Sequence, residues 1–477
     1  MEAGRGSPPD SFMTPLDDRE IGKTAFELSP DAQRRGFRMM VLTTMAGLIG
    51  DEVFGGNILI IIALHFQATD GYIGLLWFLI LGSSLTQLLI VGFAQEKPKK
   101  NVLYGIYGVA LLLSLPVLGL QWTSRWHGAT AALAVLAGCV GLRQIVFSSA
   151  NPLWMALLRQ MTPLGQRGRW LGLLRTGWQS VVVLTLIITG LYLGRHPEWS
   201  RLQIMVLVGL IAQLVRILCI IPIPSTPAPS PAGRIGWWDM ILTPVRDKAF
   251  QPFLLYTAFY GLALGLQEGF RLVYLIRLGF GQNLALVCSS LTALGAVTTL
   301  FLWGRLADRF GNHGVFSLTL AGLWVGVVCW LFVSGHPAGL ILGMILFFAG
   351  GVFTSGNGLV QTRYLLAALK PQLEASYIAV TYLVLQQAMG IGALLGGQIL
   401  TVAHQSGFQI GKPGPNNYHI IFVLSALMFL VPWFLRRKFK EPADSPTRQV
   451  IAVVLQPVRT VVGSVVLWAT GQDKEDS

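Results

Sequence analysis

The sequence predicts an all-α membrane protein whose twelve transmembrane helices form two pseudo-symmetric bundles of six. Three observations support this prediction: the composition, the length of the apolar segments and an internal repeat. Of the 477 residues, 53% are hydrophobic and 12% are charged, whereas soluble domains carry roughly 25% charged residues. Most of the surface of such a chain is therefore expected to face lipid.

The apolar segments are about twenty residues long, which is the length of helix that crosses about 30 Å of hydrocarbon. The alternating ten-residue pattern of a β-barrel does not occur. The 54 glycines suit helices that pack closely in a bilayer. We place the twelve spans at residues 37–66, 72–94, 102–121, 129–158, 170–193, 202–223, 252–278, 284–304, 315–333, 338–364, 374–402 and 418–435.

The basic residues set the orientation of these spans. With the N-terminus inside, twenty Lys and Arg residues fall on the cytoplasmic side and five in the outer loops. This bias places both termini in the cytoplasm of a multi-pass protein of the cell (inner or plasma) membrane. It also accounts for the net charge of +13, so a nucleic-acid partner is not expected. The five outer residues are Arg125, Arg195, Arg201, Arg277 and Lys412.

The domain boundaries follow from the spans and from one proline-rich stretch. Five prolines between Pro222 and Pro231 divide the apolar segments into two sets of six and indicate a linker. Trp237 and Trp238 follow it and are typical of an interfacial segment. The predicted parts are a cytoplasmic tail (1–36), an N-terminal bundle (37–223), a cytoplasmic linker (224–251), a C-terminal bundle (252–435) and a second cytoplasmic tail with a possible amphipathic helix (436–477).

The two halves repeat. Residues 147–153, in the fourth span, match residues 353–359, in the tenth, with Asn151 opposite Asn357 at an offset of 206. A second match, at an offset of 212, relates Gly92, Glu96 and Lys97 to Gly304, Asp308 and Arg309. Parallel repeats of six helices are a transporter architecture in which the solute site lies between the halves.

Residues 304–311 read Gly-Arg-Leu-Ala-Asp-Arg-Phe-Gly. This run resembles the signature of the major facilitator superfamily, and with the six-plus-six layout the resemblance covers residues 37–435. The first-half copy departs from it, because Glu96 replaces the usual aspartate. The resemblance implies a central cavity lined by spans one, four, seven and ten.

The signature is expected to act as a conformational latch on the cytoplasmic face. A glycine permits a tight turn and close helix approach, which we assign to Gly304, and Asp308 can pair with a cation across that face. Arg363, at the inner end of the tenth span, is the candidate partner. The alternative is a solvated turn with a charge pair. The latch residues are Gly304, Asp308, Arg309, Gly311 and Arg363.

Ionisable residues near the bilayer midplane are costly, so they are candidates for function. Five occur here, and all lie in spans one, four and seven, which line the cavity in the family that the chain resembles. Polar residues of the first, fourth and tenth spans join them. The candidate substrate and coupling residues are Asp51, Glu52, Asn57, Arg143, Asn151, Glu268, Arg271, Asn357 and Gln361.

Helix breaks point to the same region. We expect interruptions at Gly55 and Gly56 in the first span, at Pro152 in the fourth, and at Gly356 and Gly358 in the tenth. Interrupted helices free backbone groups that can meet a solute in a water-lined cavity.

Structural interpretations remain open for several of these residues. Glu268 and Arg271 are three residues apart and can neutralise each other on one helix. Asp51 can pair with Arg143 as a static bridge, and because Asp51 and Glu52 point about 100° apart, at most one is expected to face the cavity squarely. Arg216, near a helix end, is expected to extend its charge to the membrane surface.

The resemblance implies secondary active transport of a small polar organic solute by alternating access, and we expect a buried carboxylate to couple it to protons. Burial disfavours a charged carboxylate and a nearby arginine favours it, so movement of Arg143 or Arg271 would change its proton affinity. We expect a monomer in the lipid bilayer, without a cofactor, driven by a proton gradient.

Two rival functions remain. The first is an exporter of lipophilic drugs or lipids, whose path would be lined by aromatic residues such as Trp77, Trp154 and Trp178. The second is a non-transporting membrane sensor or assembly protein. An enzyme is not expected, because the sequence has no phosphate-binding glycine loop or nucleophile set. The four cysteines lie in apolar segments at no metal-ligand spacing, so no metal is expected.

Overall fold

The computed structural model describes residues 29–87, 98–161, 167–224, 237–368, 374–406 and 417–438, and within these ranges it contains helices and no strand. The all-α prediction is thereby confirmed for this part of the chain. The first-half signature copy at Gly92 to Lys97, most of the proline-rich linker and the tail from residue 439 onward lie outside the described residues.

The described residues of the first predicted bundle form nine α-helices and two short 3₁₀ turns. They are α2 (Pro30–Gly55), α3 (Asn57–His65), α4 (Asp70–Gly82), η1 (Ser83–Leu85), α6 (Lys99–Ser114), η2 (Leu115–Gly119), α7 (Leu120–His127), α8 (Ala129–Ser148), α9 (Ala150–Met161), α10 (Arg167–Leu193) and α11 (Trp199–Ile220).

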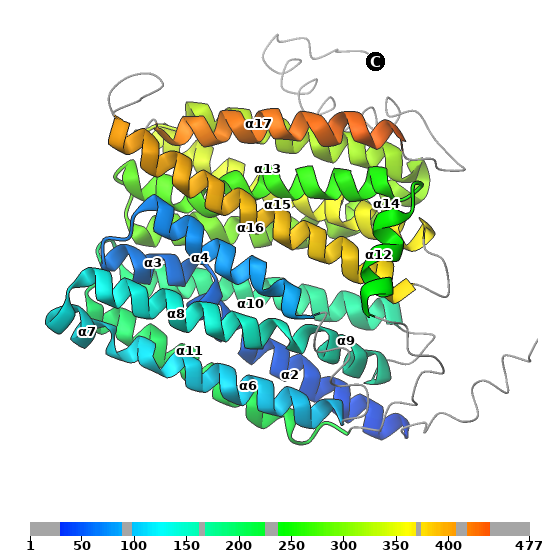
Figure 1. The fold of residues 1–477 in the computed structure, drawn as a ribbon, viewed down its shortest axis with the longest axis horizontal. Helices are drawn as coiled ribbons and strands as arrows, with labels where there is room; N and C mark the ends of the chain where they lie inside the picture. The colour runs from blue at the N-terminus through cyan, green and yellow to red at the C-terminus, as the bar shows by residue number, and fades with distance from the viewer. Residues whose placement is uncertain are drawn as a thin grey trace, which may run out of the picture.

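The remaining elements begin with α12, which lies within the predicted linker. They are α12 (Trp237–Arg246), α13 (Gln251–Arg277), α14 (Gln282–Cys329), η4 (Trp330–Phe332), α15 (Pro337–Ala368), α16 (Glu374–Ser406), α17 (Tyr418–Leu435) and η7 (Arg436–Lys438). The long helices lie side by side, whereas α12 runs across their ends (Figure 1).

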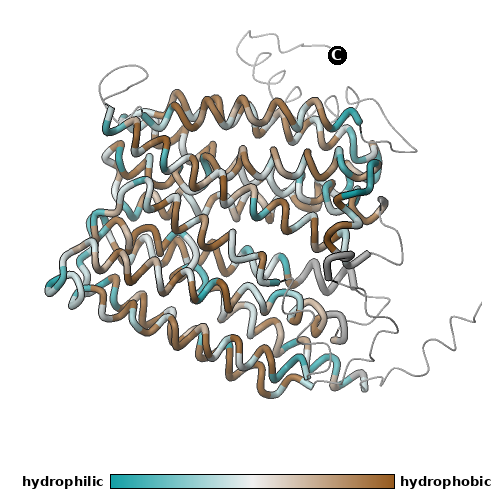
Figure 2. Tube along the Cα trace, viewed as in Figure 1, coloured by the Kyte–Doolittle hydropathy of each residue, from teal (hydrophilic) through white to brown (hydrophobic). Residues whose placement is uncertain are grey.

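Length and composition suit these helices to a membrane. In the described ranges, nine helical stretches are long and apolar enough to cross one, with Gln282–Phe332 counted as a single stretch. Helix α13, which carries Glu268 and Arg271, falls outside this set. Hydrophobic residues fill most of the helix length, and hydrophilic ones gather near the helix ends (Figure 2). The count of twelve spans and the cytoplasmic termini stay predictions.

Two of the three predicted helix breaks are confirmed. Gly56 separates α2 from α3 with an extended backbone, at φ −121° and ψ −153°. Ser149 separates α8 from α9. Pro152 explains the second break, because it lacks the N–H that would bond to the Ser148 carbonyl in a continuous helix.

The third predicted break, at Gly356 and Gly358, is wrong, because α15 is continuous from Pro337 to Ala368. A Cβ added at Gly356 would lie 2.6 Å from the Trp303 ring. This glycine therefore serves close packing of α15 against α14 instead of interrupting the helix.

The two predicted bundles meet along two helix pairs, α4 with α16 and α10 with α14. A Cβ added at Gly74 in α4 would lie 2.5 Å from the Ala393 carbonyl oxygen in α16. In the second pair, the Gln282 amide donates to the Arg195 carbonyl at 3.2 Å, and Arg195 Nη2 donates to the Gly279 carbonyl at 3.1 Å. Small residues and backbone bonds therefore hold the halves in close contact.

Side-chain contacts also join the halves at the predicted outer end. The buried Asp70 carboxylate accepts a hydrogen bond from Tyr418 Oη at 2.6 Å. His404 Nδ1 lies 3.3 Å from the other oxygen of Asp70. The Gly71 amide donates to Thr401 Oγ1 at 2.9 Å. These contacts tie the start of α4 to the end of α16 and the start of α17.

Candidate solute-binding cavity

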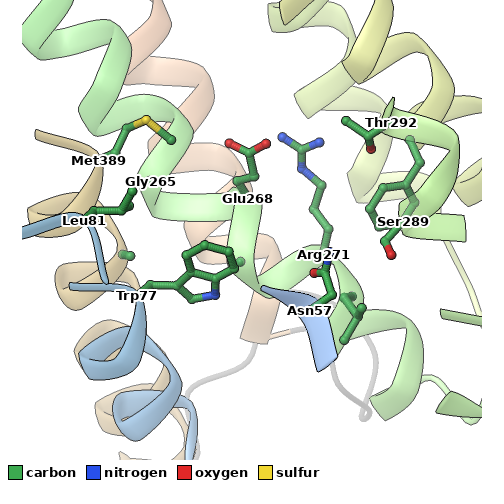
Figure 3. Close-up of a pocket in the computed structure, with 13 residues that line it drawn as sticks. Asn57, Trp77, Leu81, Gly265, Glu268, Arg271, Ser289, Thr292 and Met389 are labelled. Atoms are coloured by element: carbon green, nitrogen blue, oxygen red, sulfur yellow. The ribbon is translucent and has the colours of Figure 1, made fainter. Parts of the chain in front are cut away.

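A cavity of about 260 Å³ lies between the two predicted bundles. The first bundle contributes α3 and α4, and the second contributes α13, α14, α15 and α16 (Figure 3). Its lining residues are Asn57, Trp77, Leu81, Gly265, Glu268, Gly269, Arg271, Leu272, Ser289, Thr292, Phe347, Met389 and Ala393.

Glu268 and Arg271 bring opposite charges to one wall of this cavity. In the close-up view, both side chains point the same way from α13 (Figure 3). No salt bridge within 4.0 Å joins them, and Glu268 accepts no hydrogen bond from any described residue. The two residues therefore form no direct ion pair, although their charges interact electrostatically.

Gln267 orients the Arg271 guanidinium. Arg271 is 3% exposed, and its Nε donates to Gln267 Oε1 at 2.6 Å. Its two terminal nitrogens donate to no acceptor in the described part of the chain. One edge of the guanidinium is thus fixed to α13, while the terminal nitrogens remain available to a ligand.

Two glycines of α13 allow other parts of the cavity wall to approach this helix. A Cβ at Gly265 would lie 2.0 Å from the Met389 carbonyl oxygen, and one at Gly269 would lie 2.3 Å from Trp77 Nε1. Glycine at these positions lets α16 and the Trp77 ring approach α13 closely. The position of the Trp77 ring therefore depends on Gly269.

A second charged cluster surrounds Asp51 in the first bundle. Arg143 Nη2 and Gln213 Nε2 each donate to Asp51 Oδ1 at 2.9 Å, and Arg216 Nη1 donates to Oδ2 at 3.0 Å. Asp51 and Arg143 thus form the bridge that the sequence analysis considered. One carboxylate here serves two guanidinium groups, which are 1% and 8% exposed for Arg143 and Arg216.

Arg216 does not extend to the membrane surface, so the expectation from its place near a helix end is wrong. Its guanidinium turns inward to Asp51, and it lies 4.6 Å from the centre of the Tyr107 ring. Arg143 lies 4.7 Å from the centre of the Phe147 ring. Aromatic faces stabilise cations, so these rings and Asp51 together hold two buried positive charges.

Glu52 points to the helix break instead of to this cluster. The Asn57 amide donates to Glu52 Oε2 at 3.4 Å. A carboxylate at a helix N-terminus satisfies free N–H groups and opposes the positive end of the helix dipole. Glu52 therefore caps α3, and neither Asp51 nor Glu52 lines the cavity.

The repeated asparagines lie in different surroundings. Asn357 is fully buried, its Nδ2 donates to Tyr256 Oη at 2.9 Å and to Thr319 Oγ1 at 3.2 Å, and its Oδ1 accepts from Gln361 at 2.5 Å. Asn151, in contrast, is exposed. Asn357 and Gln361 thus belong to a polar network inside the second bundle, outside the cavity.

The signature run forms a turn with the expected charge pair. Arg363 Nη1 donates to Asp308 Oδ1 at 2.5 Å, and Arg363 Nε donates to Asn312 at 3.0 Å. Gly311 has φ 77° and ψ 171° and divides α14 into two helical arms, a conformation that favours glycine.

Gly304 and Arg309, the other glycine and the other arginine assigned to the latch, make no contact of the kind expected for it with any described residue. A Cβ at Gly304 would meet no described atom within 4 Å, so the close approach expected there is wrong and Gly311 makes the turn. The Arg309 guanidinium lies 5.2 Å from the centre of the Phe310 ring.

Three of the nine predicted cavity residues, Asn57, Glu268 and Arg271, therefore line the described cavity. Asp51 and Arg143 form one separate cluster, Asn357 and Gln361 another, Glu52 caps α3 and Asn151 is exposed. Sequence reasoning missed Gln267, although its position four residues before Arg271 was a usable signal.

Comparison with known proteins decides the family. The sequence profile described as Major Facilitator Superfamily matches residues 40–362 and 277–471. The chain belongs to the Major Facilitator Superfamily. It is accordingly a multi-pass membrane protein of a transporter superfamily, and the resemblance seen in its sequence is confirmed.

A curated superfamily relative is described as a homolog of the multi-drug resistance efflux pump PmrA from Lactococcus lactis subsp. lactis (strain IL1403). It is 26% identical over 270 residues, which are 54% of this chain and 64% of the relative. The match thus spans less than two thirds of the relative's length.

Solved structures share the superfamily fold. A mutant of the nucleoside transporter NupG has a TM-score of 0.69 at 11% identity, covering 85% of this chain and 100% of its own. A bacterial homologue of the iron transporter ferroportin in an inward-facing state has a TM-score of 0.63 at 13% identity, covering 86% and 98%. A bacterial homologue of the human lysosomal transporter Spinster has a TM-score of 0.61 at 15% identity, and the match covers 87% of this chain and 98% of that one.

Proposed function

We propose that the protein is a secondary active transporter that moves a small polar organic solute by alternating access and couples this movement to protons. The observation that carries the proposal is the cavity between the two predicted bundles, with unpaired Glu268 and Arg271 in its wall. We further propose that it acts as a monomer in the plasma membrane, without a cofactor.

Alternating access requires that one end of the cavity be closed while the other admits solute. The contacts of Asp70, Gly71 and Arg195 across the bundles support closure at the predicted outer end. On the opposite side, we propose that the pair between Asp308 and Arg363 is a latch that changes during the transport cycle. The solute then enters or leaves through the end that carries this pair.

Glu268 is the carboxylate best placed for proton coupling. The oxygens of Asp51 accept hydrogen bonds from Arg143, Arg216 and Gln213, whereas Glu268 accepts none from any described residue. A carboxylate without fixed donors can exchange its proton with a solute group or with water as the cavity changes its exposure.

An uptake comparison tests this proposal. Cells with and without the protein are incubated with a mixture of metabolites, and the accumulated solute is then tested in proteoliposomes with a pH gradient. We expect gradient-driven accumulation that is lost in Glu268→Gln and retained in Glu198→Gln, whose carboxylate is exposed outside the cavity. Unaltered gradient-driven uptake in an Asp51→Asn, Glu52→Gln and Glu268→Gln triple variant would refute the coupling.

A second candidate is the export of lipophilic drugs or lipids. The efflux-pump relative favours it, as do Trp77, Phe347 and Met389 in the cavity wall. A thermal-shift screen distinguishes the two candidates. Stabilisation by amphiphilic cations, with no response to polar metabolites, would replace our proposal with this one.

The rival from another class is a non-transporting sensor or assembly protein. Deletion of residues 441–477 tests it, because transport through the cavity does not need the tail. We expect the truncated protein to transport the solute at a rate similar to the full chain. The sensor would be favoured over the transporter if the full chain took up no solute and the truncated protein lost a partner complex that the full chain forms.

A further inference from the structure

The charged residues in the cavity wall indicate which class of small polar solute the cavity binds. We infer that the cavity recognises a zwitterion of the neutral α-amino acid class, with its ammonium group at Glu268 and its carboxylate at Arg271. This inference rests on the proposed function, because it names the solute of the same cavity.

The two wall charges interact electrostatically but form no direct ion pair. Glu268 and Arg271 lie three residues apart on α13, point the same way (Figure 3), and form no ion pair within 4.0 Å. The ammonium and carboxylate of an α-amino acid are likewise adjacent. Such a ligand can contact both wall charges at once, with each of its charges next to the opposite sign.

The Arg271 guanidinium has a fixed orientation. The hydrogen bond from its Nε to Gln267 leaves the two terminal nitrogens, which form the edge of a guanidinium that binds a carboxylate with two parallel hydrogen bonds. A guanidinium that is held in place before binding loses less rotamer freedom when the ligand arrives.

The two wall charges also balance each other. Glu268 and Arg271 together contribute no net charge, so a purely anionic solute leaves Glu268 without a cation and a purely cationic one leaves Arg271 without an anion. An uncompensated charge is costly away from water. A zwitterion satisfies both.

The rest of the wall includes apolar side chains beside the charged patch. Leu81, Leu272, Phe347 and Met389 line the cavity, together with the polar groups of Asn57, Trp77 and Thr292. The apolar side chains can contact the side chain of a neutral amino acid while its charged groups contact Glu268 and Arg271.

Matched ligands test the inference on the unaltered protein. The neutral protein amino acids are screened by thermal shift and by uptake into proteoliposomes, each beside its N-acetyl derivative, which lacks the cation, and its methyl ester, which lacks the anion. We expect at least one amino acid to bind and to be transported, with each derivative binding about tenfold more weakly or worse.

Two variants assign the contacts. The Glu268→Gln variant should bind the amino acid no more tightly than its N-acetyl derivative. The Arg271→Gln variant should bind the amino acid no more tightly than its methyl ester. Glu198→Gln and Arg125→Gln, both exposed and outside the cavity, should leave both differences in binding unchanged. Size-exclusion chromatography and the melting temperature show whether each variant is folded.

The outcomes separate the inference from the proposed function. Uptake of another solute class, or equal binding of an amino acid and its two derivatives, overturns the zwitterion inference and leaves the transporter proposal intact. The absence of uptake of any solute by the folded protein overturns both. The inference is also overturned if both cavity variants still bind the amino acid more tightly than its two derivatives, because the residues that contact its charged groups then lie elsewhere.

Discussion

Replacement of Asp51 by asparagine should destabilise the protein strongly. The carboxylate is the common acceptor for Arg143 and Arg216, which are 1% and 8% exposed. Asparagine keeps one acceptor oxygen but removes the negative charge, so two buried guanidinium groups lose their counterion. The variant therefore leaves two positive charges facing each other inside the first bundle.

The structure sets the expected size of this effect. Removal of one partner of a buried ion pair costs about 3–5 kcal/mol. The Asp51 side chain is 25% exposed, and because water compensates part of the loss, we expect about 3 kcal/mol, the lower end of that range. An unfolding entropy of about 2 cal/mol/K per residue then corresponds to a fall of about 3 °C in the melting temperature.

Thermal unfolding of the detergent-solubilised protein, followed by tryptophan fluorescence, measures this effect. The control is Asp308→Asn, which removes an ion pair whose carboxylate side chain is 70% exposed and should cost about 0.5 kcal/mol. A second variant, Asp51→Asn with Arg216→Met, should be more stable than Asp51→Asn alone, because it removes one uncompensated charge. Equal melting temperatures for Asp51→Asn and Asp308→Asn would refute the reasoning.

Three further substitutions test other contacts. Tyr418→Phe removes a hydrogen bond across the bundles worth about 1 kcal/mol, so amide hydrogen exchange at the start of α4 should quicken about fivefold, and unchanged exchange would contradict the outer closure. Gly311→Ala forces a side chain to φ 77° and should cost about 1–2 kcal/mol in thermal unfolding, whereas Gly304→Ala, in open space, should cost less. Gly269→Ala should displace the Trp77 ring and weaken solute binding, measured by titration; unchanged affinity would show that the ring does not shape the cavity.

Much of the fold was predictable because it depends on local chemistry. Long apolar segments predict helices that span lipid, since every backbone group there must be hydrogen-bonded internally. Pro152 predicts the break before α9, since it lacks an N–H, and Gly55 and Gly56 predict the break after α2. The signature also predicted a turn, but the sequence assigned it to Gly304, whereas Gly311 makes it.

The polar clusters were harder to predict because they join residues far apart in the sequence. Arg216 lies 165 positions from Asp51, so its place near a helix end indicated the membrane surface and gave no sign of its true partner. Asn151 and Asn357 share a repeated motif, yet only Asn357 is buried, because Tyr256 approaches it from α13. Periodicity along one helix does not reveal which neighbours cover each face.

The glycines of α15 illustrate the same limit. Gly356 was interpreted as a helix breaker, but in the structure it makes room for the Trp303 ring. A glycine in a membrane helix serves either flexibility or close packing, and only the neighbouring helix decides between them.

The central claim is that solute crosses the membrane through the cavity that holds Glu268 and Arg271. The most direct test is solute exchange in proteoliposomes, comparing the unaltered protein with a folded Glu268→Gln and Arg271→Gln double variant. We expect the unaltered protein to exchange labelled solute across the membrane and the double variant to exchange at least about tenfold more slowly, because both charged groups of the cavity wall are then lost. Equal exchange by the two proteins would place the solute path elsewhere and contradict the account.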